Sequence, residues 1–164
     1  YGSSGSIGTF AVQIAKHFGA EVTAVCTPSS IDLVTSLGAD HIIDHTQQDF
    51  TENGEVYDVI FYTIGKSPYP RSKQSLTPGG VYLQANPNFG HMMGAIWTAL
   101  TSRKKIDVTM ARETSEDLDT LREMFEAGTI TSVIDRTYPL EQMADAHRYV
   151  ELGEKNGHLV VTFT

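Results

Sequence analysis

The sequence predicts an α/β fold with a doubly wound parallel sheet, because short apolar segments alternate along the chain with helical ones. Most of the apolar segments have no polar face, as expected for parallel strands that helices cover on both sides. The chain has 164 residues, of which 40% are hydrophobic. This is enough for one domain of about 150 residues with a substantial core.

The first half of the chain supplies the pattern most clearly. Residues 6–18 predict a helix that ends at Gly19, because apolar residues recur on one face at three- and four-residue spacing. These residues are Ile7, Ala11, Ile14, Ala15 and Phe18. Residues 57–64 (YDVIFYTI) are mostly aromatic or β-branched, which predicts the most buried strand. The other elements expected here are strands over 22–26 and 41–44 and a short helix over 31–37 that Gly38 ends.

The second half continues the alternation of helices and strands. Residues 115–127 predict an amphipathic helix with Ser115 as N-cap and Gly128 after its end. Its expected core face consists of Leu118, Leu121, Met124 and Phe125. The remaining expected elements are helices over 72–76, 90–102 and 139–153, a turn over 77–80, and strands over 81–85, 106–110, 130–138 and 159–163.

Charge and cysteine content exclude several classes of protein. The chain carries 12 Lys and Arg against 20 Asp and Glu, a net charge of −8, which disfavours nucleic-acid and anionic-membrane partners. The longest uncharged apolar stretch, residues 92–100, is about half of what a bilayer crossing needs. The single cysteine, Cys26, excludes an internal disulfide and a multi-cysteine zinc site. We therefore expect a soluble cytoplasmic protein.

The chemistry of the chain concentrates in its first turn, residues 1–8 (YGSSGSIG). A glycine-rich turn that leads into a helix points backbone N–H groups and the helix dipole at one place, which favours a diphosphate. Gly5 would let the backbone approach the pyrophosphate, and Gly8 would let the helix pack closely. Ser3 replaces the first glycine of the G-x-G-x-x-G pattern. The helix and the apolar strand that follow nevertheless favour dinucleotide binding.

Two other loops that could follow a strand do not fit these residues. A nucleotide-hydrolase loop needs Lys and Ser or Thr after its last glycine, whereas Gly8 is followed by Thr9 and Phe10. A hydrolase nucleophile elbow needs glycine two residues after its serine, and Ser6 occupies that position after Ser4. Dinucleotide binding is the interpretation that remains.

The end of the second strand indicates which dinucleotide is bound. An acidic residue there would bind the ribose 2′-OH of NAD and repel the 2′-phosphate of NADP. Residues 26–30 (CTPSS) contain no acid, and the first one is Asp32. Small hydroxyl residues accommodate a phosphate, so the sequence favours NADP over NAD. The missing acid also disfavours an S-adenosylmethionine enzyme, which usually binds its ribose through such a residue. Ser29 and Ser30 are alternatively residues that cap a helix.

Five segments together resemble the medium-chain dehydrogenases/reductases, in family order. They are GSSGSIGTFAVQIAKHFGAEVTAVC, LGADHIIDHTQQDF, YDVIFYTIG, LTPGGVYLQ and IDRTYPLEQMADAHRYVELGEKNGHLVV. The resemblance covers essentially the whole chain and is to the zinc-independent, quinone oxidoreductase-like branch, often labelled zinc-type alcohol dehydrogenase-like. It implies a Rossmann-type fold and an NADP(H)-dependent oxidoreductase. Such an enzyme transfers hydride to or from quinones, enones or related carbonyl and alcohol substrates.

The resemblance also implies which residues contact the cofactor. They are Ser4, Gly5, Ser6 and Ile7 at the pyrophosphate, Thr27 and Ser29 at the 2′-phosphate, His45 beside the adenosine, and Thr63, Ile64 and Gly65 at the nicotinamide. Relatives usually carry a basic residue near Ser29, Asp before the position of Thr63, and Lys at the position of His158. This chain has none of these. No catalytic residue is assigned.

The resemblance assigns residues 1–128 to the dinucleotide-binding domain and residues 129–164 to a segment that packs toward an N-terminal catalytic domain. That domain supplies the substrate pocket and any zinc ligands, and the chain alone is expected to be inactive. The first strand of the sheet is reduced to Tyr1, which would leave unpaired ladder groups that another segment or chain fills. The strand at 106–110 is a candidate edge for a homodimer. The alternative function is a non-catalytic nucleotide-binding or self-associating module.

His41, Asp44 and His45 form a cluster of candidate metal ligands. Their spacing is not that of a helical zinc pair, and no cysteine pair accompanies them. We therefore expect no metal site in this chain. Cys26 is interpreted as a small buried hydrophobic residue at the end of a strand.

Overall fold

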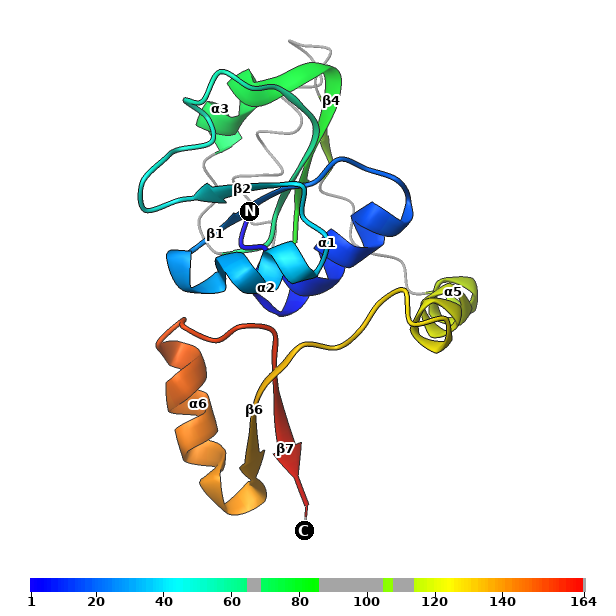
Figure 1. The fold of residues 1–164 in the computed structure, drawn as a ribbon, viewed down its shortest axis with the longest axis vertical. Coiled ribbons are helices and arrows are strands. Elements are labelled where there is room, and N and C mark those ends of the chain that lie inside the picture. Colours follow the sequence, from blue (N-terminus) through cyan, green and yellow to red (C-terminus); the bar gives the residue numbers. More distant parts are fainter. Residues whose placement is uncertain (65–68, 86–104, 108–113, 164) are drawn as a thin grey trace.

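The computed structural model describes residues 1–64, 69–85, 105–107 and 114–163 (Figure 1). The expected helix over 90–102, the end of the expected strand over 106–110, and Gly65 lie outside the described residues. The helices are α1 (Ser6–His17), α2 (Ile31–Ser36), α3 (Tyr69–Ser72), α5 (Ser115–Glu126) and α6 (Met143–Glu151), with short 3-10 turns at Pro28–Ser30, Lys73–Ser75 and Leu140–Gln142. The strands are β1 (Thr23–Cys26), β2 (His41–Asp44), β3 (Tyr57–Tyr62), β4 (Leu76–Gln84), β5 (Lys105–Asp107), β6 (Ile134–Pro139) and β7 (His158–Thr162).

All the strand pairs in the described part of the chain are parallel, which confirms the predicted α/β fold. They form three separate ladders, in the orders β1-β2, β3-β4-β5 and β6-β7. In the first ladder Cys26 pairs with Asp44, and in the second Tyr62 pairs with Gln84. The last residues of neighbouring strands therefore lie at one edge of each ladder, which is the edge where α/β proteins bind their ligands.

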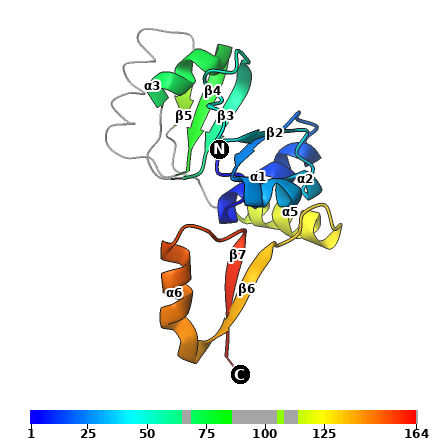
Figure 2. The same ribbon diagram turned by 60° about the vertical axis from the view of Figure 1, so that its left-hand side comes forward.

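Tyr1 and Gly2 occupy the position between the first two ladders, as the N-terminus does in Figure 2. The Tyr1 amino group donates a hydrogen bond to Phe61 O at 2.7 Å, and Thr63 N donates to Tyr1 O at 3.1 Å. On the other side, Gly2 N donates to Val25 O at 3.0 Å. Tyr1 thus bridges β1 and β3 as one residue of a parallel strand would.

A cavity of about 940 Å³ extends from Tyr1 between β1 and β3. Its lining includes Ala11, Ile14 and Ala15 of α1 and Val59 of β3. The apolar face expected for α1 therefore faces this cavity in part. The two ends of this apolar face are exposed to solvent, since Ile7 is 46% exposed and Phe18 is 73% exposed. The buried side of α1 is instead formed by Gly8, Thr9, Val12 and Gln13.

The main core lies on the other face of the two ladders. It is formed by Val25, Ile43, Phe50, Ile60, Tyr62, Leu76 and Tyr82. The Tyr1 ring stacks on Tyr62 with 4.6 Å between the ring centroids, so it completes this core. The strand expected over 57–64 ends at Tyr62, and it is only partly buried, because Asp58 and Val59 are exposed. Val59 is exposed because it lines the cavity, which leaves that face of β3 uncovered.

Two local expectations are corrected in the middle of the chain. The expected turn over 77–80 is part of β4, and its irregularity appears as a register shift between Tyr57 and Val59. The N-cap of α5 is Thr114 rather than Ser115, since Thr114 Oγ1 accepts a hydrogen bond from Asp117 N at 3.1 Å. Asp117 also accepts from Thr114 N, which completes a capping box.

Helix α5 is amphipathic as predicted, but its expected core face is mostly exposed. Met124 is buried, whereas Leu118 is 64% exposed and Leu121 and Phe125 are also exposed. Phe10 of α1 meets Phe125 edge to face, with 5.8 Å between the centroids, and this contact holds α5 beside α1 (Figure 1). Helix α5 therefore packs on the rest of the protein through Met124 and Phe125, near its C-terminal end.

The C-terminal ladder and α6 project away from the other elements (Figure 1). β6 begins at Ile134, later than the expected residue 130. The reason is that the side-chain amide of Gln13 forms hydrogen bonds with both the backbone N–H and the backbone C=O of Thr131. These two groups are therefore not available to pair with a neighbouring strand. None of the helices in the described part of the chain is long and apolar enough to span a membrane.

Candidate cofactor-binding site

Hydrogen bonds to β1 and close backbone contacts within the turn fix the position of the glycine-rich turn. Ser3 N and Ser3 Oγ both donate to Val25 O, at 3.2 and 3.0 Å. Gly2 has a φ of +82°, and a Cβ there would lie 2.7 Å from Thr63 Oγ1. A Cβ on Gly8 would lie 2.2 Å from Gly2 O. The fold therefore requires glycine at positions 2 and 8, and Gly8 has the packing role expected of it.

Gly5 differs from these two glycines because the fold itself does not require it. Gly5 is the N-cap of α1 with an ordinary φ of −75°. The nearest atom to a Cβ built on Gly5 is Gly2 O, at 3.5 Å, which is an ordinary van der Waals contact. The space above Gly5 is thus open at the start of α1, where backbone N–H groups lack intrahelical acceptors. The first turn of α1 contains no acidic residue that would compete for this place.

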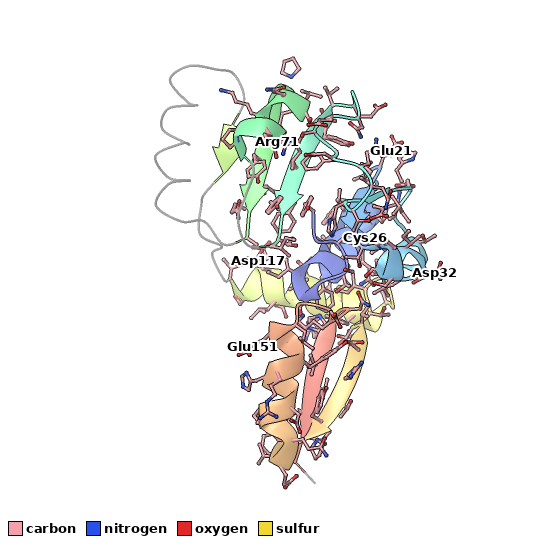
Figure 3. The ribbon with its side chains drawn as sticks, turned by 90° about the vertical axis from the view of Figure 1, so that its left-hand side faces the viewer. Glu21, Cys26, Asp32, Arg71, Asp117 and Glu151 are labelled. Atoms are coloured by element: carbon pink, nitrogen blue, oxygen red, sulfur yellow. The ribbon has the colours of Figure 1, made fainter. Side chains whose placement is uncertain are left out.

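The turn after β1 contributes hydroxyl groups to the same edge. Thr27 Oγ1 lies 3.1 Å from both Ser29 Oγ and Ser30 Oγ. Ser30 is buried and donates to Asn156 Oδ1 at 2.7 Å, whereas Ser29 is exposed. Ser30 is the N-cap residue of α2, as the capping alternative expects, but within the described residues neither Ser29 nor Ser30 makes a side-chain capping hydrogen bond. Asp32, the first acid after β1, is exposed on the outer side of α2 (Figure 3).

The other expected contacts lie where β2 and β3 end. His45 follows β2, donates its backbone N–H to Cys26 O at 3.1 Å, and has its ring 5.9 Å from that of Tyr1. Thr63 follows β3, and its hydroxyl is bonded to Tyr1 O at 2.9 Å and lies 3.1 Å from Gly2 O. Ile64 is half exposed. The described residues expected at the cofactor therefore follow the ends of adjacent strands, beside the glycine-rich turn.

Sequence reasoning missed one part of this site, residues 155–157. Gly157 N donates to Ser4 O at 2.7 Å, and Ser6 Oγ donates to Gly157 O at 2.7 Å. Lys155 Nζ donates to Ser6 Oγ at 2.6 Å. No local pattern indicates these contacts, because about 150 residues separate the partners and only folding brings them together.

Comparison with known proteins identifies the family. The zinc-binding dehydrogenase family matches residues 37–161, which is most of the chain. The chain belongs to the zinc-binding dehydrogenase family. This result confirms the resemblance to the medium-chain dehydrogenases/reductases of the quinone oxidoreductase-like branch, in their nucleotide-binding part.

Individual relatives support the same placement. A chloroplastic quinone oxidoreductase of Triphysaria versicolor is 30% identical over 97% of this chain and 50% of its own length. A mitochondrial NAD(P)H oxidoreductase of Mus musculus is 31% identical over 98% of this chain and 46% of its own length. The quinone oxidoreductase structure from Coxiella burnetii superposes with a TM-score of 0.86 at 21% identity, over 99% of this chain and 51% of that one. The chain thus spans about half the length of the relatives it matches.

The described residues do not fit the zinc ion that the family name implies. They contain no group of three or more His, Cys, Asp or Glu side chains placed to hold a metal ion. Cys26, the only cysteine, is buried at the end of β1 (Figure 3). Burial, and secondarily the charge of Asp44, raises the pKa of the Cys26 thiol, which disfavours the thiolate that zinc requires.

The same residues do fit the dinucleotide of this dehydrogenase family. The space next to Gly5 is open, and a side chain at this position would occupy it. This space lies at the positive end of the α1 dipole, where the pyrophosphate of a dinucleotide would be attracted. The cavity of about 940 Å³ is a different feature, because it lies between β1 and β3 and neither Gly5 nor Ser6 lines it. The cofactor would therefore lie across the strand ends and outside that cavity.

Proposed function

We propose that this chain is the cofactor-binding domain of an NADP(H)-dependent oxidoreductase. The enzyme would transfer hydride to or from quinones, enones or related carbonyl and alcohol substrates. The observation that carries the proposal is Gly5, a glycine that packing does not require, at the open N-terminus of α1. The names of the relatives, a quinone oxidoreductase and an NAD(P)H oxidoreductase, support the reaction class.

The residues after β1 support NADP over NAD. NAD is typically held by a carboxylate at this place, which accepts hydrogen bonds from the ribose diol. Here Thr27 and Ser29 offer hydroxyl groups, and Asp32 lies on the outer side of α2. Hydroxyl groups donate to a 2′-phosphate without repelling it, so NADPH should bind more tightly than NADH.

The residues of this chain would bind and orient the cofactor, and the bound dinucleotide would supply or accept the hydride. The turn over residues 4–7 would hold the pyrophosphate, and His45 would lie beside the adenosine. Thr63 is a positioning residue, because its hydroxyl is already engaged by Tyr1 O and Gly2 O. It fixes the end of β3, where the nicotinamide would lie, and is not placed to donate a proton. The substrate would be bound by a part of the enzyme outside this chain.

The proposal includes a homodimer formed through a sheet edge. In the described part of the chain, β5 pairs with β4 on one side and with no strand on the other. A second copy could add its β5 there and continue the sheet. Light scattering on the protein should give twice the monomer mass, and a monomer at all concentrations would contradict the dimer.

Cofactor binding is tested by comparing the protein with its Gly5→Ala variant. For the unsubstituted protein, NADPH at about 100 times its dissociation constant should raise the free energy of unfolding by about 2.7 kcal/mol. In Gly5→Ala the added methyl group occupies the pyrophosphate's space, so this increase should largely disappear. Without cofactor, the variant should lose less than about 1 kcal/mol, since the new Cβ is 3.5 Å from its nearest neighbour.

Titrating NADH in parallel tests the choice of cofactor. Tighter binding of NADPH supports the role of Thr27 and Ser29, and tighter binding of NADH overturns it. If the folded protein responds to neither cofactor at millimolar concentration, the proposed function is wrong.

A further inference from the structure

Lys155 places a positive charge at the start of α1. Its Nζ donates to Ser6 Oγ at 2.6 Å and to Gly157 O at 2.8 Å. Ser6 is the first residue of α1, and the side chain of Lys155 is half buried there. The ammonium group therefore lies beside the glycine-rich turn, although Lys155 belongs to the segment that precedes β7.

No carboxylate in the described part of the chain forms an ion pair with Lys155. Within the described residues, the hydrogen-bond acceptors of Lys155 are a hydroxyl and a carbonyl, and none of the ion pairs involves it. The nearby carboxylate of Asp135 accepts instead from Tyr149 Oη at 2.8 Å and from Asn156 N at 3.4 Å.

The positive charge of Lys155 lies close to the positive end of the α1 dipole. The N-terminus of a helix carries a partial positive charge, so a cation there is repelled and an anion is attracted. The first turn of α1 has no acidic side chain that would compensate. An anion between Lys155 and the N-terminus of α1 would be attracted by both.

Contacts on both sides hold Lys155 in this place. Gly157 N donates to Ser4 O at 2.7 Å, and Gly5 and Gly157 form an isolated parallel bridge. Asn156 Oδ1 accepts from Ser30 Oγ at 2.7 Å, which joins the segment to the turn after β1. A Cβ on Gly157 would lie 2.4 Å from Val133 O, so the backbone cannot shift freely. Lys155 is therefore pre-positioned rather than on a free loop.

We propose that Lys155 binds the pyrophosphate of the cofactor and is a specificity-determining residue for phosphorylated ligands. The inference rests on the proposed function and assigns to its site a cation from the other end of the chain. The contact with Ser6 favours the pyrophosphate over the 2′-phosphate, because the neighbouring residue, Asn156, is the one that reaches the turn after β1. On binding, the ammonium group exchanges its neutral acceptors for phosphate oxygens.

The test compares dissociation constants of NADPH and NADH for the protein and for Lys155→Met, measured by titrating cofactor fluorescence. Both constants should rise about tenfold to a hundredfold and by similar factors, because both cofactors carry the pyrophosphate. Lys155→Arg should retain most of the affinity. Arg148→Met is the matched control, since it also removes one positive charge, and among the described residues the Arg148 side chain bonds only Asp145 on α6. It should leave both constants unchanged.

Each other outcome overturns a defined part of the proposal. Unchanged affinity in Lys155→Met, with or without a lower unfolding temperature, would mean that Lys155 only fastens the C-terminal segment. A loss confined to NADPH would place Lys155 at the 2′-phosphate. If Lys155→Met does not fold, Lys155→Gln keeps a donor for Gly157 O without the charge and should show the same loss. Failure of the unsubstituted protein to bind either cofactor would overturn the proposed function together with this inference.

Discussion

The side chain of Gln13 pairs with the backbone of Thr131 as a neighbouring strand would. Gln13 Oε1 accepts from Thr131 N at 2.8 Å, and Gln13 Nε2 donates to Thr131 O at 3.1 Å. The same amide nitrogen also donates to Thr9 O, within α1, at 2.9 Å. Gln13 is buried, so these bonds replace water on the amide and join α1 to the segment that precedes β6.

Gln13→Leu should lower the free energy of unfolding by about 1–3 kcal/mol, because it removes the partners of Thr131 N and O while keeping a side chain of similar size. Urea denaturation measures the change. Gln48→Leu is the control, since Gln48 is exposed and should change stability by less than about 0.5 kcal/mol. Equal effects of the two substitutions would show that the Gln13 bonds contribute nothing to stability.

Gly8→Ala should destabilise the protein without any cofactor present. The new Cβ would lie 2.2 Å from Gly2 O and 2.6 Å from Ser3 Cα, both backbone atoms that cannot rotate away. We expect a loss of about 1–3 kcal/mol or failure to fold. Gly5→Ala is the matched comparison, because its Cβ has 3.5 Å of clearance. If both variants melt at the temperature of the unsubstituted protein, the packing described here for Gly8 is wrong.

Asp40 should make stability depend on pH in the acid range. The hydrogen bond from Lys16, together with one from Val22 N, lowers the pKa of the Asp40 carboxyl in the folded state. A lowered pKa adds stability above the unfolded value of about 3.9, and this stability is lost as the pH falls through the folded pKa. Asp40→Asn should therefore unfold at lower urea than the unsubstituted protein at pH 6, and the difference should shrink toward pH 2.

A matched substitution separates this effect from general acid sensitivity. Glu55→Gln removes an exposed carboxylate whose side chain makes no ion pair within the described residues. Its urea midpoints should follow those of the unsubstituted protein at every pH. A pH-independent difference for Asp40→Asn would show that the Lys16 contact acts by packing rather than by charge.

Cys26 should react slowly with alkylating agents in the folded protein. The thiol is buried, and burial together with the Asp44 charge raises its pKa, while the hydrogen bond with Ser3 opposes the rise. Less thiolate therefore forms at pH 8, and less of it is accessible. Iodoacetamide labelling followed by mass spectrometry should be far slower without urea than with it. Equal rates in the two conditions would contradict the burial of Cys26.

The elements that local signals specify were predictable. Helix α1 begins at Ser6 as expected and is followed by Gly19 with a φ of +78°, and α2 is followed by Gly38 with a φ of +99°. The strands β1 and β2 lie within a residue of their expected bounds. Burial was less predictable. Ile7, Val59 and Leu118 are apolar residues in correctly predicted elements and are nevertheless exposed.

The reason is that periodicity identifies an apolar face but not what covers it. The apolar side of α1 faces the cavity between β1 and β3, whereas polar Thr9 and Gln13 are buried. Gln13 is buried because Thr131, far away in the sequence, supplies matching backbone groups. No pattern within α1 could indicate such a partner.

The sequence by itself determined the order of helices and strands, the parallel character of the sheet and the glycine-rich turn, because backbone propensity and apolar spacing are local properties. The tertiary structure showed that the space at Gly5 would admit a side chain whereas the space at Gly8 would not, since this depends on the distances to Gly2 and Ser3 in the folded turn. It also decided that Lys155 lies at Ser6. Contacts between residues so far apart depend on how the whole chain packs, so the charge beside the glycine-rich turn is a property of the fold.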